Sequence, residues 1–522
     1  MIEAVCDKDG PLVTLLIPTF NRRDYLGEAV GSAVRQVWRK LQIIVVNDGG
    51  QDVRDIVESF HDHRLVLLQR AENRGKAASL NEAIEHAEGK YVAYLDDDDI
   101  LYPDHIRLLV EALEGPTDCQ VAYTNLYRAT FRRRPDGKRL ATSKLVEIRR
   151  DFDRYFMFHF NHVLHCSVMH HRDLLYKTGP YNESIRVLID WDMTRRLAFF
   201  SDFLHVDRIT GEYCVPVEKA SDRISYRMRQ DRKEFLRQLA AIRTTRPPKP
   251  WPKVQDLSII LAPPRIDAET VKTIGTVINK TFWPYLVYLV LPPGEAAKLN
   301  ASEVPNVIEI VLTSPDAPYE ERVDAALERC RGDVAAIVPM GLALEELWVE
   351  WPLHVLTHAA GTNQAVAIPR SNDLAWGVVG KRQDIAAARR EHRALTIRRS
   401  LEAAGIEVIQ PSKANYPLVF DEFLDLARSL EREGNWMDAG RIFEKMPIVC
   451  SNELWMAEQA ARALYRKGGA DGEAIELCGK VNARSPSVSS LVLEARLLRR
   501  TGQTSRAVEL LEQARDILGW KG

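Results

Sequence analysis

The chain of 522 residues is too long for one hydrophobic core, and its length suggests about three domains. It is 46% hydrophobic and 28% charged with a formal net charge of -2, so its charge gives no reason to expect a nucleic-acid partner. No apolar run approaches the ~20 residues of a membrane-spanning helix, and residues 1–10 contain no apolar signal-peptide core.

The cysteines point to a reducing compartment. All 7 lie far apart in the sequence and form no CxxC pair, which favours free thiols over a disulfide framework or a zinc site. We therefore expect a cytoplasmic protein, with at most peripheral contact with the inner face of a membrane.

The first part of the chain alternates short apolar runs with segments of helical spacing. Strands are predicted at residues 12–17, 41–46, 64–68 and 91–95, and helices at 24–38 and 75–88. This alternation is typical of an α/β domain with a largely parallel sheet. Ligands of such sheets bind at the carboxyl ends of the strands, which read PTFNRR, NDGG and DDDD here. A polar site is expected at that edge.

Four consecutive aspartates, Asp96 to Asp99, directly follow the fourth apolar run. Carboxylates this close repel one another, so a positive partner is expected beside them. Mg²⁺ and Mn²⁺ prefer carboxylate oxygens and often complete their shell with phosphate and water, so the cluster favours a metal–diphosphate site. The alternative is an acidic loop in which Asp99 caps the following helix.

The motifs of this region resemble those of the bacterial family 2 inverting glycosyltransferases of GT-A fold. They are VTLLIPTFNRRDYL, IIVVNDGG, NRGKAASLNEAIEHAEGKYVAYLDDDD and VLIDWDMTRRLA, and the resemblance covers about residues 10–235. It implies a nucleotide-diphosphate sugar as donor, with UDP favoured, and Mn²⁺ or Mg²⁺ as cofactor held by Asp98. The donor-binding residues that it implies are Pro18, Thr19, Phe20, Asn21, Arg22, Asp48, Asn73, Arg74, Gly75, Lys76, Asp96 and Asp97.

The resemblance also implies a general base roughly 90 residues beyond the aspartates. It falls on Asp190, with Asp192 as a supporting acid, although Ile189 stands where the family often has Glu. The alternative is that both aspartates cap a helix over 191–200. Asn161 and His162 are expected on the acceptor side. A metal-binding histidine of many relatives has no counterpart in the stretch Tyr213-Cys214-Val215-Pro216.

A proline-rich linker, 244–255, separates this catalytic domain, 1–243, from a second α/β segment over 256–412. QVWRKLQIIVVNDGG (36–50) aligns with TFWPYLVYLVLPPGE (281–295), and 81–100 aligns with 324–343. The apolar pattern persists, whereas Asp96, Asp97 and Asp98 align with a Pro-Met-Gly stretch. We expect a degenerate, non-catalytic copy of the first domain.

Residues 413–522 are expected to form tetratricopeptide-like helical repeats. Gly434, Gly468 and Gly502 recur at 34-residue steps, each between two segments of helical periodicity. Because repeat surfaces are extended and concave, this region is expected to bind a protein partner, a second copy or the acceptor.

The resemblance implies an inverting hexosyl- or N-acetylhexosaminyl-transferase that acts on a glycan, lipid-linked or protein acceptor in bacterial surface glycan synthesis. Two alternatives remain open. A sugar nucleotidyltransferase would need a glycine-rich phosphate loop after the first strand, and PTFNRR contains no glycine. A non-catalytic scaffold would have no use for the four aspartates.

Overall fold

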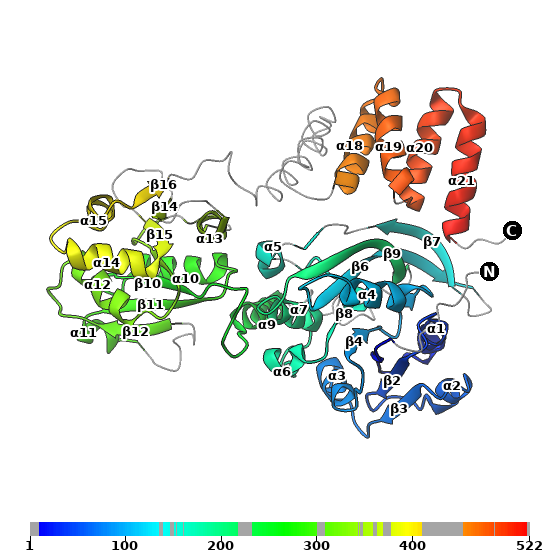
Figure 1. Cartoon of the computed structure of the whole chain (residues 1–522), viewed down its shortest axis with the longest axis horizontal. Coiled ribbons are helices and arrows are strands. Elements are labelled where there is room, and N and C mark those ends of the chain that lie inside the picture. Colours follow the sequence, from blue (N-terminus) through cyan, green and yellow to red (C-terminus); the bar gives the residue numbers. More distant parts are fainter. Residues whose placement is uncertain are drawn as a thin grey trace. The chain divides into compact units, whose positions relative to one another are not determined.

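The computed structural model describes residues 10–134, 139–146, 151–152, 154–159, 161–217, 232–299, 308–342, 344, 348–358, 363–368, 377–409, 453–484 and 486–518. The chain divides into two units (Figure 1). The first contains Met1–Ile242, Pro247–Lys253 and Val419–Gly522, and the second contains Arg243–Arg246 and Val254–Leu418.

The N-terminal domain is built on one twisted sheet whose first half is parallel, which confirms the predicted α/β class. Its strands are β1 (Val13–Thr19), β2 (Leu41–Asn47), β3 (Leu65–Gln69), β4 (Tyr91–Tyr94), β5 (Ile100–Leu101), β6 (Val121–Arg133), β7 (Arg139–Val146), β8 (Val168–His171) and β9 (Phe203–Pro216). Their order is β3-β2-β1-β4-β8-β6-β9-β5, with β7 paired to β6. The strands β1 to β4 pair in parallel, and β8 joins β4 antiparallel.

Helices cover both faces of this sheet, which explains why its strands read as continuous apolar runs. The helices are α1 (Arg23–Val34), α2 (Arg54–Glu58), α3 (Lys76–Glu85), α4 (His105–Glu114), α5 (Arg154–His159), α6 (Leu174–Thr178), α7 (Ile189–Leu197) and α9 (Arg232–Thr244), with a short 3₁₀ turn η2 (His165–Ser167). Leu16 faces a core shared with α3 and α7, whereas its neighbours Leu15 and Ile17 face a core shared with α1 and α4. This alternation fixes which helices reach the carboxyl ends of the strands.

The second unit contains a sheet whose first four strands repeat the order of the first. Its strands are β10 (Leu257–Leu261), β11 (Tyr285–Leu291), β12 (Ile308–Leu312), β13 (Val334–Ile337), β14 (Gln364–Ile368), β15 (Gly377–Lys381) and β16 (Glu407–Ile409). The order is β12-β11-β10-β13-β15-β14-β16, again with an antiparallel strand after the fourth position. Its helices are α10 (Ala268–Lys280), α11 (Pro293–Ala296), α12 (Tyr319–Arg329), α13 (Glu350–His358), α14 (Arg382–Glu391) and α15 (Ile397–Ala403).

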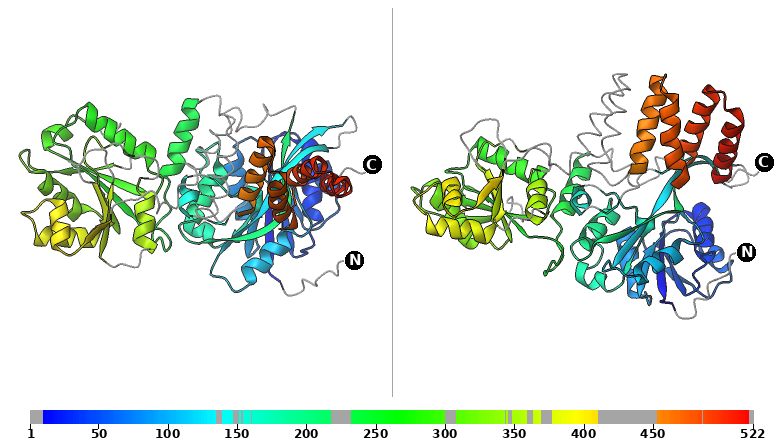
Figure 2. Two further views of the ribbon diagram at one scale, coloured as in Figure 1. Left: turned by 90° about the horizontal axis from the view of Figure 1, so that it is seen from above. Right: turned by 45° about the horizontal axis from the view of Figure 1, so that its top comes forward.

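Four described helices follow one another near the C-terminus and lie side by side (Figure 2). They are α18 (Glu453–Lys467), α19 (Asp471–Arg484), α20 (Val488–Arg500) and α21 (Thr504–Leu518). Gly468 directly follows α18 with a φ of 76°, and Gly502 lies two residues after α20 with a φ of 82°. This left-handed conformation ends a helix and favours glycine. The third predicted glycine, Gly434, lies outside the described residues. Within the described part of the chain, helices fall short of the length and hydropathy that crossing a bilayer requires.

Candidate active site

The carboxyl ends of β1, β2 and β4 meet at one edge of the sheet. Thr19 pairs with Asn47 in the parallel register, and the Asp48 N–H donates to the Thr19 carbonyl oxygen at 2.9 Å. The Thr19 hydroxyl donates to Oδ2 of Asp97 at 2.7 Å, and this bond joins the end of β1 to the loop after β4. The structure therefore brings together the three polar strand ends, as the sequence predicted.

Two basic side chains partner the aspartates. Arg22, which precedes α1, places Nη1 at 2.6 Å from Oδ2 of Asp98 and at 3.3 Å from Oδ1 of Asp97. Lys76, the first residue of α3, places Nζ at 2.6 Å from Oδ1 of Asp96. These ion pairs help the fold tolerate four adjacent carboxylates, because Asp96 and Asp98 each have a cation beside them.

The four carboxyl groups are not equivalent. Burial would raise the pKa of Asp96, but Lys76 outweighs this effect and holds it below its ordinary value. Burial and the neighbouring Asp98 charge raise the pKa of Asp97 to about 7. The same two causes raise the pKa of Asp99 well above its ordinary value. Asp96 therefore holds its negative charge more firmly than Asp97 and Asp99 do.

The aspartates fit a divalent cation. Asp96, Asp98 and Asp99 can each offer one carboxylate oxygen, and these atoms lie within 4.8 Å of one another. Hard cations prefer such oxygen donors. The Asp99 carboxylate also accepts the Cys214 N–H at 2.8 Å and the Cys166 thiol at 3.1 Å, so Asp99 braces the loop rather than capping α4. Asp96 and Asp98 remain the better placed ligands.

Asp48 organises the loop that presents Lys76. Its carboxylate accepts the Gly75 N–H at 2.7 Å, the Arg74 N–H at 3.0 Å and Nη1 of Arg70 at 2.9 Å. Gly75 has a φ of 95°, a conformation that a side chain would strain.

The remaining residues of the predicted donor site lie around the same edge. Phe20 exposes 42% of its surface, which is unusual for a phenylalanine and leaves a flat apolar face at the end of β1. Asn21 is exposed with a φ of 53°, and its side chain accepts the Gln51 N–H at 2.9 Å. Pro18 is half-buried within β1, and Asn73 is exposed ahead of α3.

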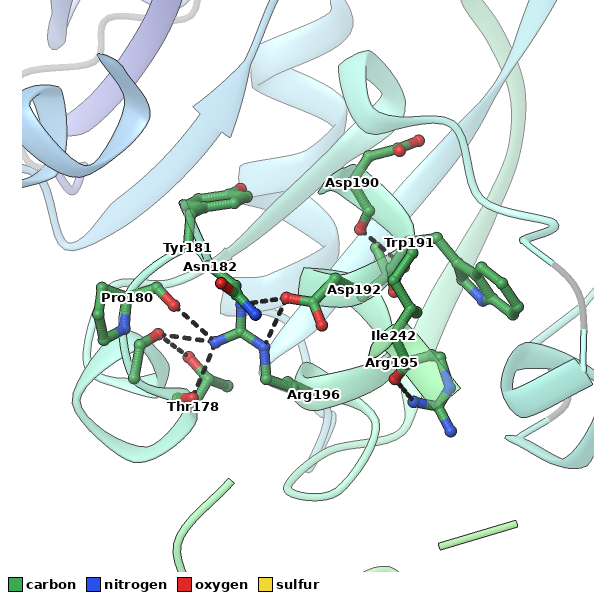
Figure 3. Close-up of polar contacts among 12 residues, drawn as sticks. Thr178, Pro180, Tyr181, Asn182, Asp190, Trp191, Asp192, Arg195, Arg196 and Ile242 are labelled. Atoms are coloured by element: carbon green, nitrogen blue, oxygen red, sulfur yellow. Dashed lines mark hydrogen bonds and ion pairs between the residues drawn. The ribbon is translucent and has the colours of Figure 1, made fainter. Parts of the chain in front are cut away.

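The two aspartates of α7 face different surroundings (Figure 3). Oδ2 of Asp190 accepts the side-chain amide of Asn161 at 2.9 Å. Asp192 is 1% exposed, and its Oδ2 lies 2.6 Å from Nη2 of Arg196, whose Nη1 donates to three backbone carbonyls after α6. The structure thus brings Asp190, but not Asp192, toward the site, and Asp192 holds Arg196 in the core. Leu188, with a φ of 57°, turns the chain into α7 just before Asp190.

Lys76 links the two acidic groups of the site. Burial opposes its protonation, yet the Asp96 and Asp190 carboxylates together raise its pKa. Asp190 therefore lies close enough to Lys76 for their charges to interact.

The histidine-rich stretch supplies one further residue near the aspartates. His162, expected on the acceptor side, is buried and lies edge-on to Tyr123, with ring centroids 6.5 Å apart. His165, which sequence reasoning missed, stacks on Tyr94 with ring centroids 4.1 Å apart and places Nδ1 at 3.9 Å from Oδ1 of Asp96. Burial lowers its pKa and favours the neutral ring. No spacing rule distinguishes His165 from His162 in HVLHC.

Comparison with known proteins finds a family model that matches part of the N-terminal domain. Residues 14–175 match the family model described as glycosyl transferase family 2. An uncharacterized glycosyltransferase of Rickettsia prowazekii (strain Madrid E) is 29% identical over 192 residues, which are 35% of this chain and 58% of the relative. The chondroitin synthase of Pasteurella multocida (strain Pm70) is 28% identical over 206 residues, or 38% of this chain and 20% of that one. The chain therefore spans only part of each relative.

Two solved structures align with less than half of this chain. Staphylococcus aureus TarS 1–349 aligns with a TM-score of 0.34 and 18% identity over 44% of this chain and 65% of that one. The mannosyltransferase PcManGT of Pyrobaculum calidifontis, solved in complex with GDP-Man and Mn²⁺, aligns with a TM-score of 0.35 and 22% identity. The alignment covers 46% of this chain and 67% of that one.

Proposed function

We propose that the N-terminal domain is a metal-dependent inverting glycosyltransferase. It moves a hexosyl or N-acetylhexosaminyl group from a nucleotide-diphosphate sugar, a UDP-sugar, to a hydroxyl of an acceptor. One observation carries the proposal: Asp96 and Asp98 stand at the sheet edge with Lys76 beside them, and Asp190 acts on the same lysine. The family 2 match over residues 14–175 supports the reaction class. UDP is favoured by the sequence resemblance alone.

On the donor side, Asp98 and Asp96 would hold the Mn²⁺ or Mg²⁺ ion beside the diphosphate. When bound, the ion neutralises charge that develops on the departing nucleoside diphosphate. Arg22 is positioned to support the same role, because its guanidinium stays charged at all working pH values and matches phosphate oxygens geometrically. Phe20, exposed at the end of β1, offers a flat face to the base or ribose.

On the acceptor side, Asp190 is the general base. It takes the proton of the acceptor hydroxyl while that oxygen forms a bond to the anomeric carbon. The bond from this carbon to the diphosphate oxygen breaks, its electron pair leaves with the nucleoside diphosphate, and the configuration inverts. Asp192 takes no part, because its carboxylate is committed to Arg196.

The acceptor belongs to a bacterial surface glycan, in the form of a glycan, a lipid-linked precursor or a protein. The match to a chondroitin synthase favours a polysaccharide. In this proposal the second α/β unit is non-catalytic, and the C-terminal helices bind the acceptor, a protein partner or a second copy of the chain.

The proposal is tested by measuring UDP release from UDP-glucose, UDP-galactose, UDP-N-acetylglucosamine and UDP-N-acetylgalactosamine with Mn²⁺, with water as the acceptor. We expect release from at least one donor and its loss on addition of EDTA. Release that persists in EDTA would contradict the metal-dependent mechanism. Absence of release from all four, together with no binding of UDP, would contradict the proposed donor class.

A further inference from the structure

We propose that Asn161 is a positioning residue for Asp190: its side-chain amide occupies one oxygen of the carboxylate and turns the other toward the acceptor hydroxyl. Sequence reasoning placed Asn161 on the acceptor, whereas the structure places it on the base. The inference rests on the proposed function of Asp190.

The orientation of the Asn161 amide follows from its two contacts. The backbone N–H of Val163 lies 3.3 Å from Oδ1 of Asn161, and since an N–H can only donate, the atom facing it is the amide oxygen. The amide nitrogen therefore faces Asp190, where Nδ2 donates to Oδ2 at 2.9 Å. Within the described part of the chain, no other hydrogen bond to the Asp190 carboxylate is found, so Oδ1 is left for the incoming hydroxyl.

The segment that delivers Asn161 is anchored on α7 itself. The indole of Trp191, the residue after Asp190, donates to the Met157 carbonyl oxygen of α5 at 2.8 Å. Met157 is fully buried, and Arg154 at the start of α5 donates to the Ala198 carbonyl oxygen at 2.9 Å just after α7. Asn161 therefore binds the side chain of Asp190, and Met157 binds the indole of the next residue, Trp191. These neighbouring contacts fix the geometry in which Asn161 meets Asp190.

A neutral donor suits a base in this setting. The titratable groups that act on Asp190 from neighbouring elements are Lys76 of α3, His165 of η2 and Tyr181 after α6. Lys76 already pairs with Asp96 at 2.6 Å. The Asn161 amide adds a hydrogen bond at Asp190 without adding a charge. Asn161 therefore orients one carboxylate oxygen and leaves the other for the acceptor hydroxyl.

The test uses the full chain with Asn161→Asp, which keeps the side-chain shape and the oxygen facing Val163 but replaces the donor with an acceptor. Two carboxyl groups at this distance share a proton, so we expect kcat for UDP release near pH 7 to fall about 10- to 100-fold. The acid limb of the kcat–pH profile should move upward by at least about one pH unit, with the donor KM nearly unchanged. Asn161→Ala should lower kcat about 10-fold.

The matched control is Asn125→Ala, which removes another side-chain amide that donates to a carboxylate, that of Asp207 at 2.8 Å. We expect it to keep the wild-type pH profile. If Asn161→Asp and Asn161→Ala, shown to be folded by thermal unfolding, keep wild-type kcat and profile while Asp190→Asn is inactive, the positioning role is wrong and the base assignment stands. If Asp190→Asn is itself active, the proposed function fails instead. A rise in donor KM without a change in kcat would also overturn the inference.

Discussion

The two α/β units share a hydrogen bond from an aligned tryptophan, Trp38 in the first and Trp283 in the second, to the backbone just before the central strand. We call such shared backbone-holding bonds framework contacts. In the first unit the indole of Trp38 donates to the Pro11 carbonyl oxygen at 3.2 Å, two residues before β1. In the second unit the indole of Trp283 donates to the Gln255 carbonyl oxygen at 2.8 Å, two residues before β10. Each bond fixes the entry of the chain into a central strand.

A second shared contact joins the central strands at the end remote from the site. Gly89 donates its N–H to the Thr14 hydroxyl at 2.9 Å, and Gly332 donates to the Ser258 hydroxyl at 3.1 Å. A Cβ on Gly89 would lie 2.5 Å from the Thr14 nitrogen, and one on Gly332 would lie 2.6 Å from the Ser258 hydroxyl. Both positions therefore require glycine, for the same steric reason.

The opposite edge of the two sheets differs at Lys76 and at the aspartates after β4. The first residue of α3 is Lys76, whereas the first residue of α12 is Tyr319. The aspartates after β4 are replaced after β13 by Pro339, Met340 and Gly341. The framework contacts hold the strands, whereas the proposed chemistry depends on the polar edge, so one can be retained without the other. The comparison predicts where substitutions change the reaction and where they change only stability.

The largest effect is expected from Asp190→Asn, which removes the proton acceptor. UDP release should fall about 10²- to 10⁴-fold, since general base catalysis supplies rate of this order. Binding of UDP with Mn²⁺, measured by calorimetry, should stay near the wild-type value. The control is Asp192→Asn on the same helix: it should lower the free energy of unfolding by about 3 kcal/mol because it breaks a buried ion pair. The rate of UDP release per folded molecule of this control should equal that of wild type. Equal losses of turnover in both variants would contradict the assignment.

The next effect is expected from Asp98→Asn. Loss of a metal ligand should reduce UDP release about 10²-fold and abolish the stabilisation that Mn²⁺ gives UDP binding. Thermal unfolding with and without Mn²⁺ measures this directly. Asp316→Asn, an exposed aspartate of the second unit, should behave as wild type. A normal Mn²⁺ response of Asp98→Asn would remove Asp98 from the metal site.

A pH dependence follows from Asp97 in the metal-free protein. Its pKa of about 7 in the folded state lies above the ordinary value near 3.8, so folding binds a proton there between these values. Stability from this group is present below about pH 4 and is lost as the pH rises through 7. Asp97→Asn should therefore have a higher free energy of unfolding than wild type at pH 8, by at least about 1 kcal/mol, with the gain vanishing near pH 4. A constant difference across this range would argue against the shift.

The smallest effect is expected from the shared framework. Trp38→Phe and Trp283→Phe each remove one indole hydrogen bond, so each should lower stability by about 1 kcal/mol. Neither should change kcat of UDP release by more than about twofold. Urea unfolding and steady-state rates measure the two quantities. A large loss of turnover in Trp283→Phe alone would mean that the second unit contributes to the chemistry.

The elements around the first site were predictable because local patterns determine them. Apolar runs ended by proline, asparagine or aspartate gave β1, β2 and β4 within two residues of the observed bounds. Their carboxyl ends had to meet because parallel pairing follows from the alternation with helices. The grouping of Thr19, Asp48 and Asp96 at one edge is therefore visible in the sequence.

The partners of the acidic groups were not predictable, because they depend on side-chain geometry between distant elements. Nothing in the sequence indicates that Asn161 contacts Asp190, or that His165 rather than His162 approaches Asp96. The two aspartates of α7 are chemically identical, and only the position of Arg196 one turn later hints that Asp192 is paired.

The claim that donor chemistry resides in the first unit alone is tested most directly by photoaffinity labelling. The full chain is irradiated with an azido derivative of UDP in the presence of Mn²⁺, and the labelled peptides are identified by mass spectrometry. The account predicts labelling within residues 18–22, 48–76 or 96–98 that unlabelled UDP and EDTA both suppress. Specific labelling within residues 256–409 would contradict it, because the second unit would then bind the nucleotide as well.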